Sequence, residues 1–252
     1  MIETEKKTER VFLVGVELAD TENFDLSMEE LQNLAKTAGA EVVGSYSQKR
    51  EKYDSKTFVG SGKLEEIRQM VDAEEISTVI VNNRLTPRQN VNLEESLGVK
   101  VIDRMQLILD IFAQRALSRE GKLQVELAQL KYRLPRLYGM GGQMSRTGAG
   151  IGTRGPGEQK LEKDKRHILN RAANIRKELR EVVKIRDIQR AQRSKNRVPI
   201  VALVGYTNAG KSTLLNELIK SHPDYEKDKE VFVKDMLFAT LDVTLRKALL
   251  PN

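Results

Sequence analysis

The nine residues from 205 to 213 constrain the fold of this chain more than any other feature. They read Gly-Tyr-Thr-Asn-Ala-Gly-Lys-Ser-Thr and match G-x-x-x-x-G-K-[ST], the pattern of a phosphate-binding loop. Such a loop joins a buried strand to the N-terminus of a helix. The apolar run 200–204 suits a buried parallel strand, and residues 212–220 suit the helix. The sequence therefore predicts the beginning of a P-loop nucleotide-binding domain within residues 198–252.

Each position of this loop has a chemical task in binding a nucleotide. Gly205 and Gly210 let the backbone turn so that successive N–H groups face the α- and β-phosphates. Lys211 is long enough to reach the β- and γ-phosphates, and the Ser212 hydroxyl can hold Mg²⁺. We therefore expect the nucleotide to contact Gly205, Tyr206, Thr207, Asn208, Ala209, Gly210, Lys211, Ser212 and Thr213.

The composition excludes several other kinds of site. With no cysteine among its 252 residues, the chain can form neither a disulfide framework nor a thiolate metal site. Its two histidines, His167 and His222, lie far apart in the sequence, which argues against zinc. The first ten residues are charged, and no apolar stretch approaches the length of a membrane span. We expect a soluble, cytoplasmic protein that acts as a monomer.

The net charge of +7 conceals a strong asymmetry along the chain. Residues 1–103 carry 13 basic and 20 acidic side chains, whereas residues 104–197 carry 23 basic and nine acidic ones. Residues 198–252 carry seven of each. A charge run is often only a solvated face. An excess of 14 positive charges over 94 residues nevertheless favours a polyanionic partner such as nucleic acid.

Residues 1–103 alternate between strand-like and helix-like stretches. The expected strands are 10–17, 41–46, 78–81 and 99–102, and the expected helices are 27–38, 64–71 and 85–97. Ser27 and Glu30 suggest a capping box at the start of the first helix, with Gly39 as its stop. Strands and helices that alternate at this spacing indicate a small parallel α/β domain. The sequence 60–63, Gly-Ser-Gly-Lys, suits a tight turn into a helix better than an anion-binding loop.

Residues 104–197 are expected to form a basic arm of two long helices packed as an antiparallel hairpin. Apolar residues recur at alternating steps of four and three along 105–137, with a polar slot near Arg119, and again along 161–182. This spacing is typical of a heptad-like seam, so the apolar stripe is core. The first helix is expected to run unbroken over about 50 Å. The seam comprises Met105, Leu109, Phe112, Ala116, Leu123, Leu127, Leu130, Leu134, Leu137, Leu161, Ile168, Ala172, Ile175, Leu179 and Val182.

The apex of this hairpin, residues 139–157, contains eight glycines, and Arg146 and Arg154 are its only charged side chains. One interpretation is a flexible connector, although a hairpin turn needs only two to eight residues. The other is a nucleic-acid contact, because glycine permits close backbone approach and arginine can pair with phosphate or stack on bases. The composition of the apex does not decide between them.

Four motifs resemble the HflX family of ribosome-associated GTPases. They are residues 145–158 at the apex, 58–63 (Phe-Val-Gly-Ser-Gly-Lys), 118–127 (Ser-Arg-Glu-Gly-Lys-Leu-Gln-Val-Glu-Leu) and 237–242 (Leu-Phe-Ala-Thr-Leu-Asp). They span nearly the whole chain in the family's order. The resemblance implies an α/β N-terminal domain at 1–103, a two-helix arm at 104–197 and the start of a G domain at 198–252.

The resemblance also implies a function and its residues. It implies GTP binding with Mg²⁺, and docking on the large ribosomal subunit with the arm and apex near the peptidyl-transferase region, to split or rescue stalled ribosomes. Lys211 and Thr240 would be the catalytic residues, and Thr240 would contact Mg²⁺ together with Ser212. Val243 departs from the proline that family members usually carry at this position. The residues expected to contact ribosomal RNA are Lys131, Arg133, Arg136, Arg146, Thr147, Gly148, Ile151, Arg154 and Lys160.

Two later motifs of such GTPases do not occur in the 252 residues. Neither Asp-x-x-Gly, which orders Mg²⁺ and the second switch, nor Asn-Lys-x-Asp, which recognises guanine, is present. The sequence alone therefore does not distinguish guanine from adenine. We expect the chain to be either a truncated product or part of a longer protein. Three hypotheses follow: a GTPase, an RNA-docking module that hydrolyses nothing, and a coiled-coil ATPase. The third leaves the apex motif unexplained.

Overall fold

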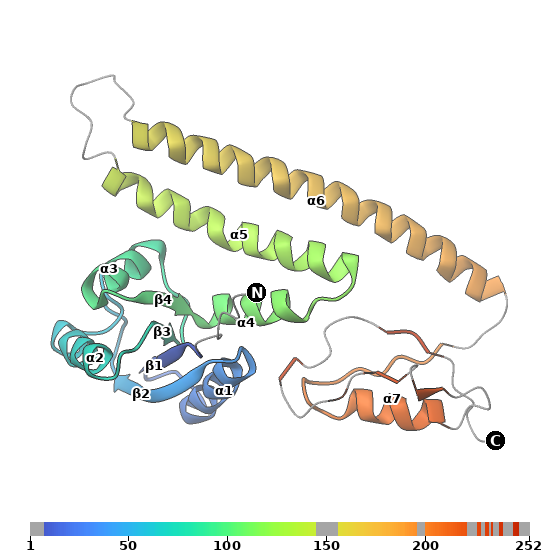
Figure 1. Cartoon of the computed structure of the whole chain (residues 1–252), viewed down its shortest axis with the longest axis horizontal. Helices are drawn as coiled ribbons and strands as arrows, with labels where there is room; N and C mark the ends of the chain where they lie inside the picture. The colour runs from blue at the N-terminus through green and yellow to red at the C-terminus, as the bar shows by residue number, and fades with distance from the viewer. Residues whose placement is uncertain are drawn as a thin grey trace, which may run out of the picture. The chain divides into compact units, whose positions relative to one another are not determined.

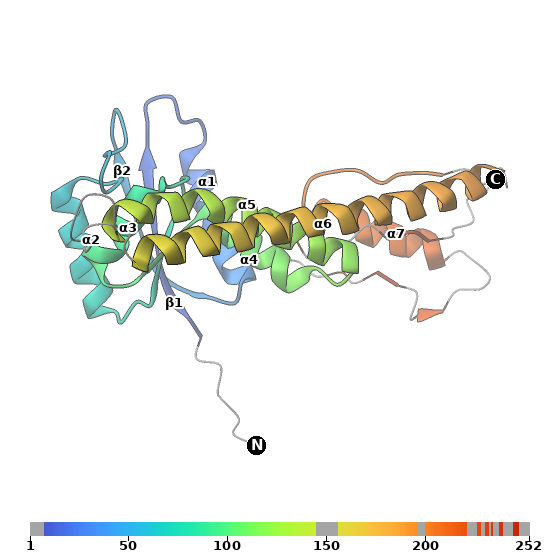
Figure 2. The ribbon, with the colours of Figure 1, turned by 90° about the horizontal axis from the view of Figure 1, so that it is seen from above.

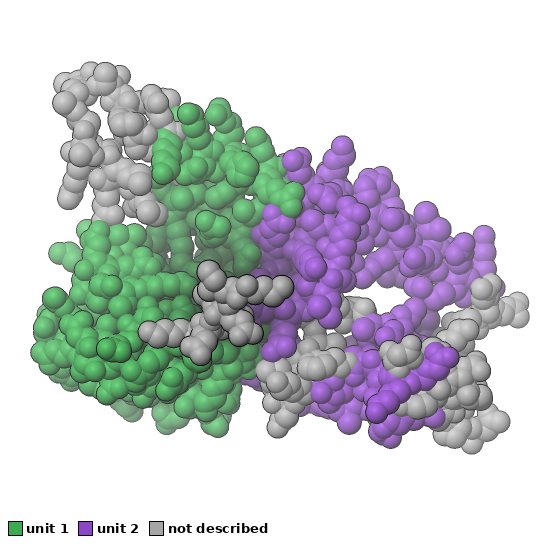
Figure 3. Space-filling model, in the orientation of Figure 1, with its two compact units in different colours: residues 1–111, 128–172 green, residues 112–127, 173–252 purple. Residues whose placement is uncertain are grey.

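The computed structural model describes residues 8–144, 156–195 and 200–220, with the short pieces 226–227, 230–231, 233, 237–238 and 244–246. The chain divides into two compact units, shown in Figure 3. The first contains residues 1–111 and 128–172, and the second contains residues 112–127 and 173–252. The domain boundaries expected from the sequence remain predictions.

The first unit contains a four-stranded parallel sheet. Its strands are β1 (Arg10–Glu17), β2 (Glu41–Lys49), β3 (Thr78–Val81) and β4 (Lys100–Asp103). They are ordered β2-β1-β3-β4, and every neighbouring pair is parallel (Figures 1 and 2). The parallel α/β architecture expected for this part of the chain is confirmed. The inner strands are apolar along their length because a parallel sheet is covered on both faces.

Helices connect the strands and form the core with them. The connecting helices are α1 (Phe24–Thr37), α2 (Ser61–Ala73) and α3 (Pro87–Leu97), and α4 (Arg104–Arg115) follows the last strand. Helices α2 and α3 share one buried cluster with alternate residues of the sheet, while α1 packs on β1 and β2. The cluster's largest contributors include Phe12, Phe58, Ile67, Val71, Leu93 and Leu97.

The capping box expected at Ser27 and Glu30 is wrong. Helix α1 begins three residues earlier, at Phe24, and its N-cap Asn23 has a left-handed backbone (φ 53°) without a side-chain cap. The hydroxyl of Ser27 instead contacts Asn82 and Arg104, and the Glu30 carboxylate pairs with Arg104. The side chains expected to cap the helix therefore form hydrogen bonds and an ion pair with residues distant in the sequence instead.

The first turn of α3 contains the capping box that this unit does form. The Gln89 backbone N–H donates to Thr86 Oγ1 at 3.2 Å, and the Thr86 N–H donates to Gln89 Oε1 at 3.0 Å. Pro87 occupies the first helical position, and Gly98 ends the helix with φ at 69°. The helix expected at 85–97, with its Pro start and Gly stop, is confirmed apart from its first two residues.

The expectation of one unbroken helix over 105–137 is wrong. Helix α4 ends at Arg115, and α5 (Arg119–Met144) begins after a break that leaves Leu117 82 % exposed. Ser118 starts the new helix, because its hydroxyl accepts the Gly121 N–H at 2.9 Å. The heptad pattern concealed this break because Ala116 and Leu123 lie seven residues apart and both are buried.

The antiparallel hairpin is formed by α5 and α6 (Pro156–Lys195), which lie side by side in Figures 1 and 2. Helix α6 has 40 residues and is roughly 60 Å long. In the second unit, ion pairs join the two helices: Arg119 pairs with Glu178 at 3.1 Å, and Glu120 pairs with Arg186 at 2.6 Å. Ile175 is fully buried, as the heptad seam predicts.

The phosphate-loop helix in the second unit is α7 (Lys211–Lys220), which confirms the helix expected at 212–220. The strand expected at 200–204 is not formed: Val201 is 73 % and Val204 90 % exposed. A parallel strand is stabilised by neighbouring strands that pair with it and cover its faces. Within the described part of this unit, no strand lies beside residues 200–204.

Candidate phosphate-binding site and basic helical surface

The loop 205–210 has the backbone turns that a phosphate-binding loop requires. Asn208 and Gly210 adopt left-handed conformations, with φ at 58° and 77°. Glycine takes this conformation without steric cost, and asparagine tolerates it better than most residues. Helix α7 starts directly after Gly210, whose carbonyl accepts the Leu214 N–H at 2.9 Å. The positive end of the helix dipole therefore lies at the loop, where it favours an anion.

Lys211 folds back over this loop. Its Nζ donates to the Tyr206 carbonyl at 2.6 Å, and its aliphatic chain lies 3.7 Å from the point where a Cβ on Gly205 would stand. The ammonium is thus held at the loop rather than extended into water. From there it can contact phosphate oxygens, as the sequence motif predicts.

The residues present suit a magnesium ion only in part. Ser212 is the second residue of α7, half-buried at the loop, and its hydroxyl is the hard oxygen ligand that Mg²⁺ accepts. Magnesium usually takes one or two ligands from the protein and the rest from water and phosphate, so one hydroxyl fits that pattern. The other expected ligand, Thr240, lies outside the described residues.

Phe238 connects the phosphate loop to the end of α4, and the sequence motifs gave no sign of this role. Its backbone N–H donates to Thr207 Oγ1 at 3.1 Å, while its ring meets Phe112 edge-on, with centroids 4.8 Å apart. Its φ of 55° is rare for a bulky side chain and is sterically strained. Phe238, which belongs to the 237–242 motif, therefore contacts both the phosphate loop and helix α4.

Asn216 is a second residue that sequence reasoning missed. It is 7 % exposed, its Nδ2 donates to the Val231 carbonyl at 2.8 Å, and its Oδ1 accepts the Val231 N–H at 2.8 Å. This side-chain amide pairs with the backbone as a neighbouring strand would. A buried polar residue on the apolar face of α7 was the available signal.

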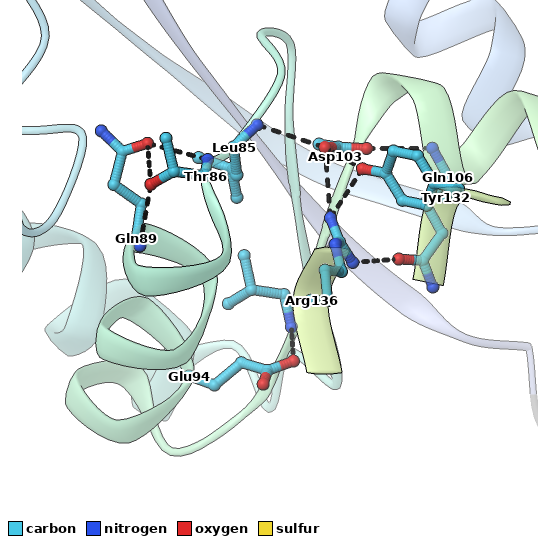
Figure 4. Close-up of polar contacts among 9 residues, drawn as sticks. Leu85, Thr86, Gln89, Glu94, Asp103, Gln106, Tyr132 and Arg136 are labelled. Atoms are coloured by element: carbon cyan, nitrogen blue, oxygen red, sulfur yellow. Dashed lines mark hydrogen bonds and ion pairs between the residues drawn. The ribbon is translucent and has the colours of Figure 1, made fainter. Parts of the chain in front are cut away.

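The expected RNA-binding residues fall into three groups. Lys131 and Arg133 on α5 and Lys160 on α6 are exposed. Arg136 is largely buried and bonded to Asp103, Gln106 and Tyr132, as Figure 4 shows. The remaining five, Arg146, Thr147, Gly148, Ile151 and Arg154, lie outside the described residues.

The turn at 60–63 forms the start of α2, as the simpler interpretation predicted. Gly60 is the N-cap residue, and Lys63 Nζ contacts the Glu66 carboxylate at 2.7 Å and lies 5.3 Å from the Tyr46 ring centroid. The Lys63 cation is thus engaged within the first unit.

No described helix combines the length and apolar character needed to cross a membrane. No group of three or more acidic or histidine side chains in the described ranges is arranged to hold a metal ion.

The fold and the loop define the class of this protein: an α/β N-terminal unit and a helical hairpin combined with a P-loop nucleotide site. Sequence models of three families match in order along the chain. They are described as GTP-binding GTPase N-terminal (residues 25–113), GTP-binding GTPase Middle Region (115–193) and 50S ribosome-binding GTPase (200–250). The chain belongs to the HflX family.

Individual relatives support this assignment. The chain is 54 % identical over 252 residues to the GTPase HflX of Caldanaerobacter subterraneus subsp. tengcongensis, covering all of this chain and 56 % of that protein. It is 45 % identical over 235 residues to the GTPase HflX of Escherichia coli K12, covering 93 % and 53 %. The chain therefore spans a little over half the length of these relatives.

A solved structure has a similar fold. It is a GTP-binding protein from Sulfolobus solfataricus in complex with GDP, with a TM-score of 0.51 and 29 % sequence identity. The similarity covers 84 % of this chain and 54 % of that protein. The expected combination of a parallel α/β unit, an antiparallel helix pair and a partial G domain is thereby confirmed.

Proposed function

We propose that this protein binds GTP at residues 205–213 and docks on the large ribosomal subunit through α5, α6 and the apex between them. The observation that carries the proposal is the loop itself: left-handed turns at Asn208 and Gly210, with Lys211 held over them at the start of α7. Support for guanine and for the ribosome comes from the relatives, which are named GTPases, and from the 50S ribosome-binding GTPase model.

In the proposed nucleotide site, catalysis is positional and electrostatic. The loop N–H groups and the dipole of α7 hold the phosphates, and Lys211 neutralises charge that develops between the β- and γ-phosphates. Ser212 and Thr240 would hold Mg²⁺, which supplies further neutralisation of phosphate charge when bound. Thr240 would also sense the γ-phosphate.

In the proposed docking mode, the arm lies against ribosomal RNA with its apex near the peptidyl-transferase region. Lys131, Arg133 and Lys160 are exposed, as phosphate contacts require. Arg146 and Arg154 would contact the ribosomal RNA, and Thr147, Gly148 and Ile151 would let the apex backbone approach it closely. A monomeric factor docked in this way would act in the cytoplasm to split or rescue stalled ribosomes.

The test is co-sedimentation of the 252-residue protein with purified large subunits over a series of salt concentrations. Each phosphate contact contributes about 0.7–0.9 to the slope of log K against log[salt]. Replacing Lys131 and Arg133 together by alanine should therefore reduce this slope by about 1.5. Replacing Lys36 and Lys52, which are exposed on the first unit outside the arm, removes the same charge and serves as the control. Equal effects of the two pairs would contradict the proposed docking face.

The nucleotide half of the proposal has its own test. GTP should displace a fluorescent GDP analogue from the protein, whereas Lys211→Met should weaken the analogue's binding without unfolding the first unit. Displacement by ATP as effective as that by GTP would contradict guanine specificity.

A second candidate function is RNA docking without hydrolysis. It concerns these 252 residues taken alone, which contain neither Asp-x-x-Gly nor Asn-Lys-x-Asp. On this alternative the protein sediments with large subunits, but the subunits do not stimulate GTP hydrolysis. Stimulated hydrolysis by the purified protein would exclude it.

A further inference from the structure

A buried carboxylate lies where α5 meets the carboxyl end of the sheet. Asp103 is the last residue of β4, and its side chain is fully buried. Its Oδ1 accepts the Gln106 N–H at 2.9 Å and so caps the first turn of α4. Its Oδ2 accepts the Leu85 N–H at 3.2 Å from the loop that leads into α3. The Asp103 side chain thus links the end of β4 to the first turn of α4 and to the loop before α3.

Two residues of α5 complete this group, which we call the Asp103 cluster: Asp103, Gln106, Tyr132 and Arg136. The Tyr132 hydroxyl donates to Asp103 Oδ2 through a short hydrogen bond. Arg136 Nη2 donates to Asp103 Oδ2 at 3.2 Å and to the Tyr132 oxygen at 2.6 Å, while Nη1 donates to Gln106 Oε1 at 2.5 Å. Figure 4 shows Tyr132 and Arg136 of α5 beside the Asp103 carboxylate, and the Gln106 side chain of α4 in contact with Arg136.

The donors and acceptors of the cluster match. The carboxylate receives four hydrogen bonds, two from backbone N–H groups and two from side chains, which compensates for its removal from water. The Arg136 guanidinium also packs on the Tyr132 ring, with its central carbon 4.5 Å from the ring centroid. Burial and the Asp103 charge raise the pKa of Tyr132, so its hydroxyl remains a proton donor at physiological pH.

The cluster also fixes how α5 is rotated about its own axis. Tyr132 and Arg136 are four residues apart and occupy one face of the helix. Lys131 and Arg133 each lie about 100° around the helix from Tyr132, and both are exposed. A rotation of α5 by one residue would bring one of these cations towards Asp103 and carry Tyr132 away from it.

We propose that Tyr132 and Arg136 are positioning residues, which hold α5 through Asp103 so that Lys131 and Arg133 face the RNA. In this arrangement Arg136 contacts the Asp103 carboxylate rather than an RNA phosphate. The inference rests on the proposed docking of the arm on ribosomal RNA. It gives Arg136 a different task from the RNA contact that the family resemblance implied.

The first measurement concerns the cluster itself and needs no ribosome. Amide hydrogen exchange over residues 128–137 should be faster in Tyr132→Phe and Arg136→Gln than in the unchanged protein. Lys131→Gln removes a cation from the same turn without touching the cluster and should leave exchange unchanged. Equal exchange in all four proteins would show that the cluster does not hold α5, and would overturn the inference.

The second measurement separates positioning from phosphate contact. Lys131→Gln should reduce the salt slope of subunit binding by about 0.7–0.9, as the loss of one phosphate contact does. Tyr132→Phe and Arg136→Gln should weaken binding several-fold while leaving the slope unchanged. Arg136→Lys keeps the charge but cannot bond Asp103, Gln106 and Tyr132 together, so it should not restore affinity.

The outcomes distinguish the two proposals. A reduced slope in Arg136→Gln, with affinity restored in Arg136→Lys, would make Arg136 a phosphate contact and overturn the positioning role. Affinity equal to that of the unchanged protein in both cluster variants would overturn it as well. Failure of the unchanged protein to bind large subunits would refute the docking proposal and the orientation role together, whereas the exchange measurement would still report on the cluster.

Discussion

Replacement of Gly210 by alanine should weaken nucleotide binding for a reason that can be worked out from the loop. Gly210 has φ at 77°, and no heavy atom outside its neighbours lies within 4 Å of the place a Cβ would occupy. The substitution therefore meets no steric clash with the surrounding protein. Its cost is conformational: an L-residue in the left-handed region is disfavoured by roughly 1–2 kcal/mol.

This cost converts directly into apparent affinity. A nucleotide that needs the left-handed turn binds only the fraction of molecules that have it, and the apparent dissociation constant rises as that fraction falls. A penalty of roughly 1–2 kcal/mol corresponds to a decrease of about 5- to 30-fold in the fraction. We expect Gly210→Ala to raise the dissociation constant for GDP by about this factor, with the thermal stability of the first unit unchanged.

Gly98 supplies a matched control. It ends α3 with φ at 69°, and it too has no heavy atom outside its neighbours within 4 Å of the place a Cβ would occupy. Gly98→Ala should therefore cost a similar conformational free energy, but in the first unit, where it lowers thermal stability and leaves GDP binding unchanged. Isothermal titration calorimetry of both variants measures the difference. The reasoning fails if Gly210→Ala binds GDP as tightly as the unchanged protein, or if Gly98→Ala weakens binding equally.

Two further predictions concern stability. Burial raises the pKa of Asp110 in the folded protein. As the pH rises, Asp110 therefore ionises in the unfolded state first, and the folded state loses stability relative to it. Asp110→Asn should raise the midpoint of thermal unfolding at pH 7 but not at pH 3. A gain that is the same at both pH values would contradict this. Ile175 is fully buried on α6, whereas Val183 on the same helix is 53 % exposed. In urea unfolding, Ile175→Ala should therefore lower the free energy of unfolding by about 2–5 kcal/mol. Val183→Ala should change it by no more than about 0.5 kcal/mol. Similar losses in the two variants would show that the seam does not stabilise the hairpin.

The parts of the fold that could be predicted from sequence are those that local chemistry determines. The strands at 10–17 and 78–81 are apolar on both faces, and the structure forms them with those bounds. The phosphate loop is a contiguous motif, so its turns and the helix after it could be read without knowledge of the rest of the fold. Pro87 and Gly98 marked the ends of α3 through their backbone preferences alone.

The parts that were missed depend on residues far apart in the sequence. The cap expected at Ser27 failed because Arg104, 77 residues later, takes its hydroxyl. In the Asp103 cluster, Asp103 contacts Tyr132 and Arg136, which lie 29 and 33 positions further along the chain. The periodicity of apolar residues does not predict that β4 and α5 meet at this point. The strand expected at 200–204 failed for the converse reason, since an apolar run forms a strand only beside others.

The Asp103 cluster also bears on how the charge of the arm should be interpreted. The chain has 43 basic and 36 acidic side chains, so one-to-one pairing of every acid with a base would still leave seven cations over. Pairs such as Arg119 with Glu178 remain within residues 104–197, and Arg136 with Asp103 takes one cation to an acid outside them. With nine acids against 23 bases, most of the arm's cations cannot pair one-to-one with an acid of residues 104–197. The charge of the arm therefore favours the proposed polyanionic partner, whereas contacts such as these decide which of its cations could reach that partner.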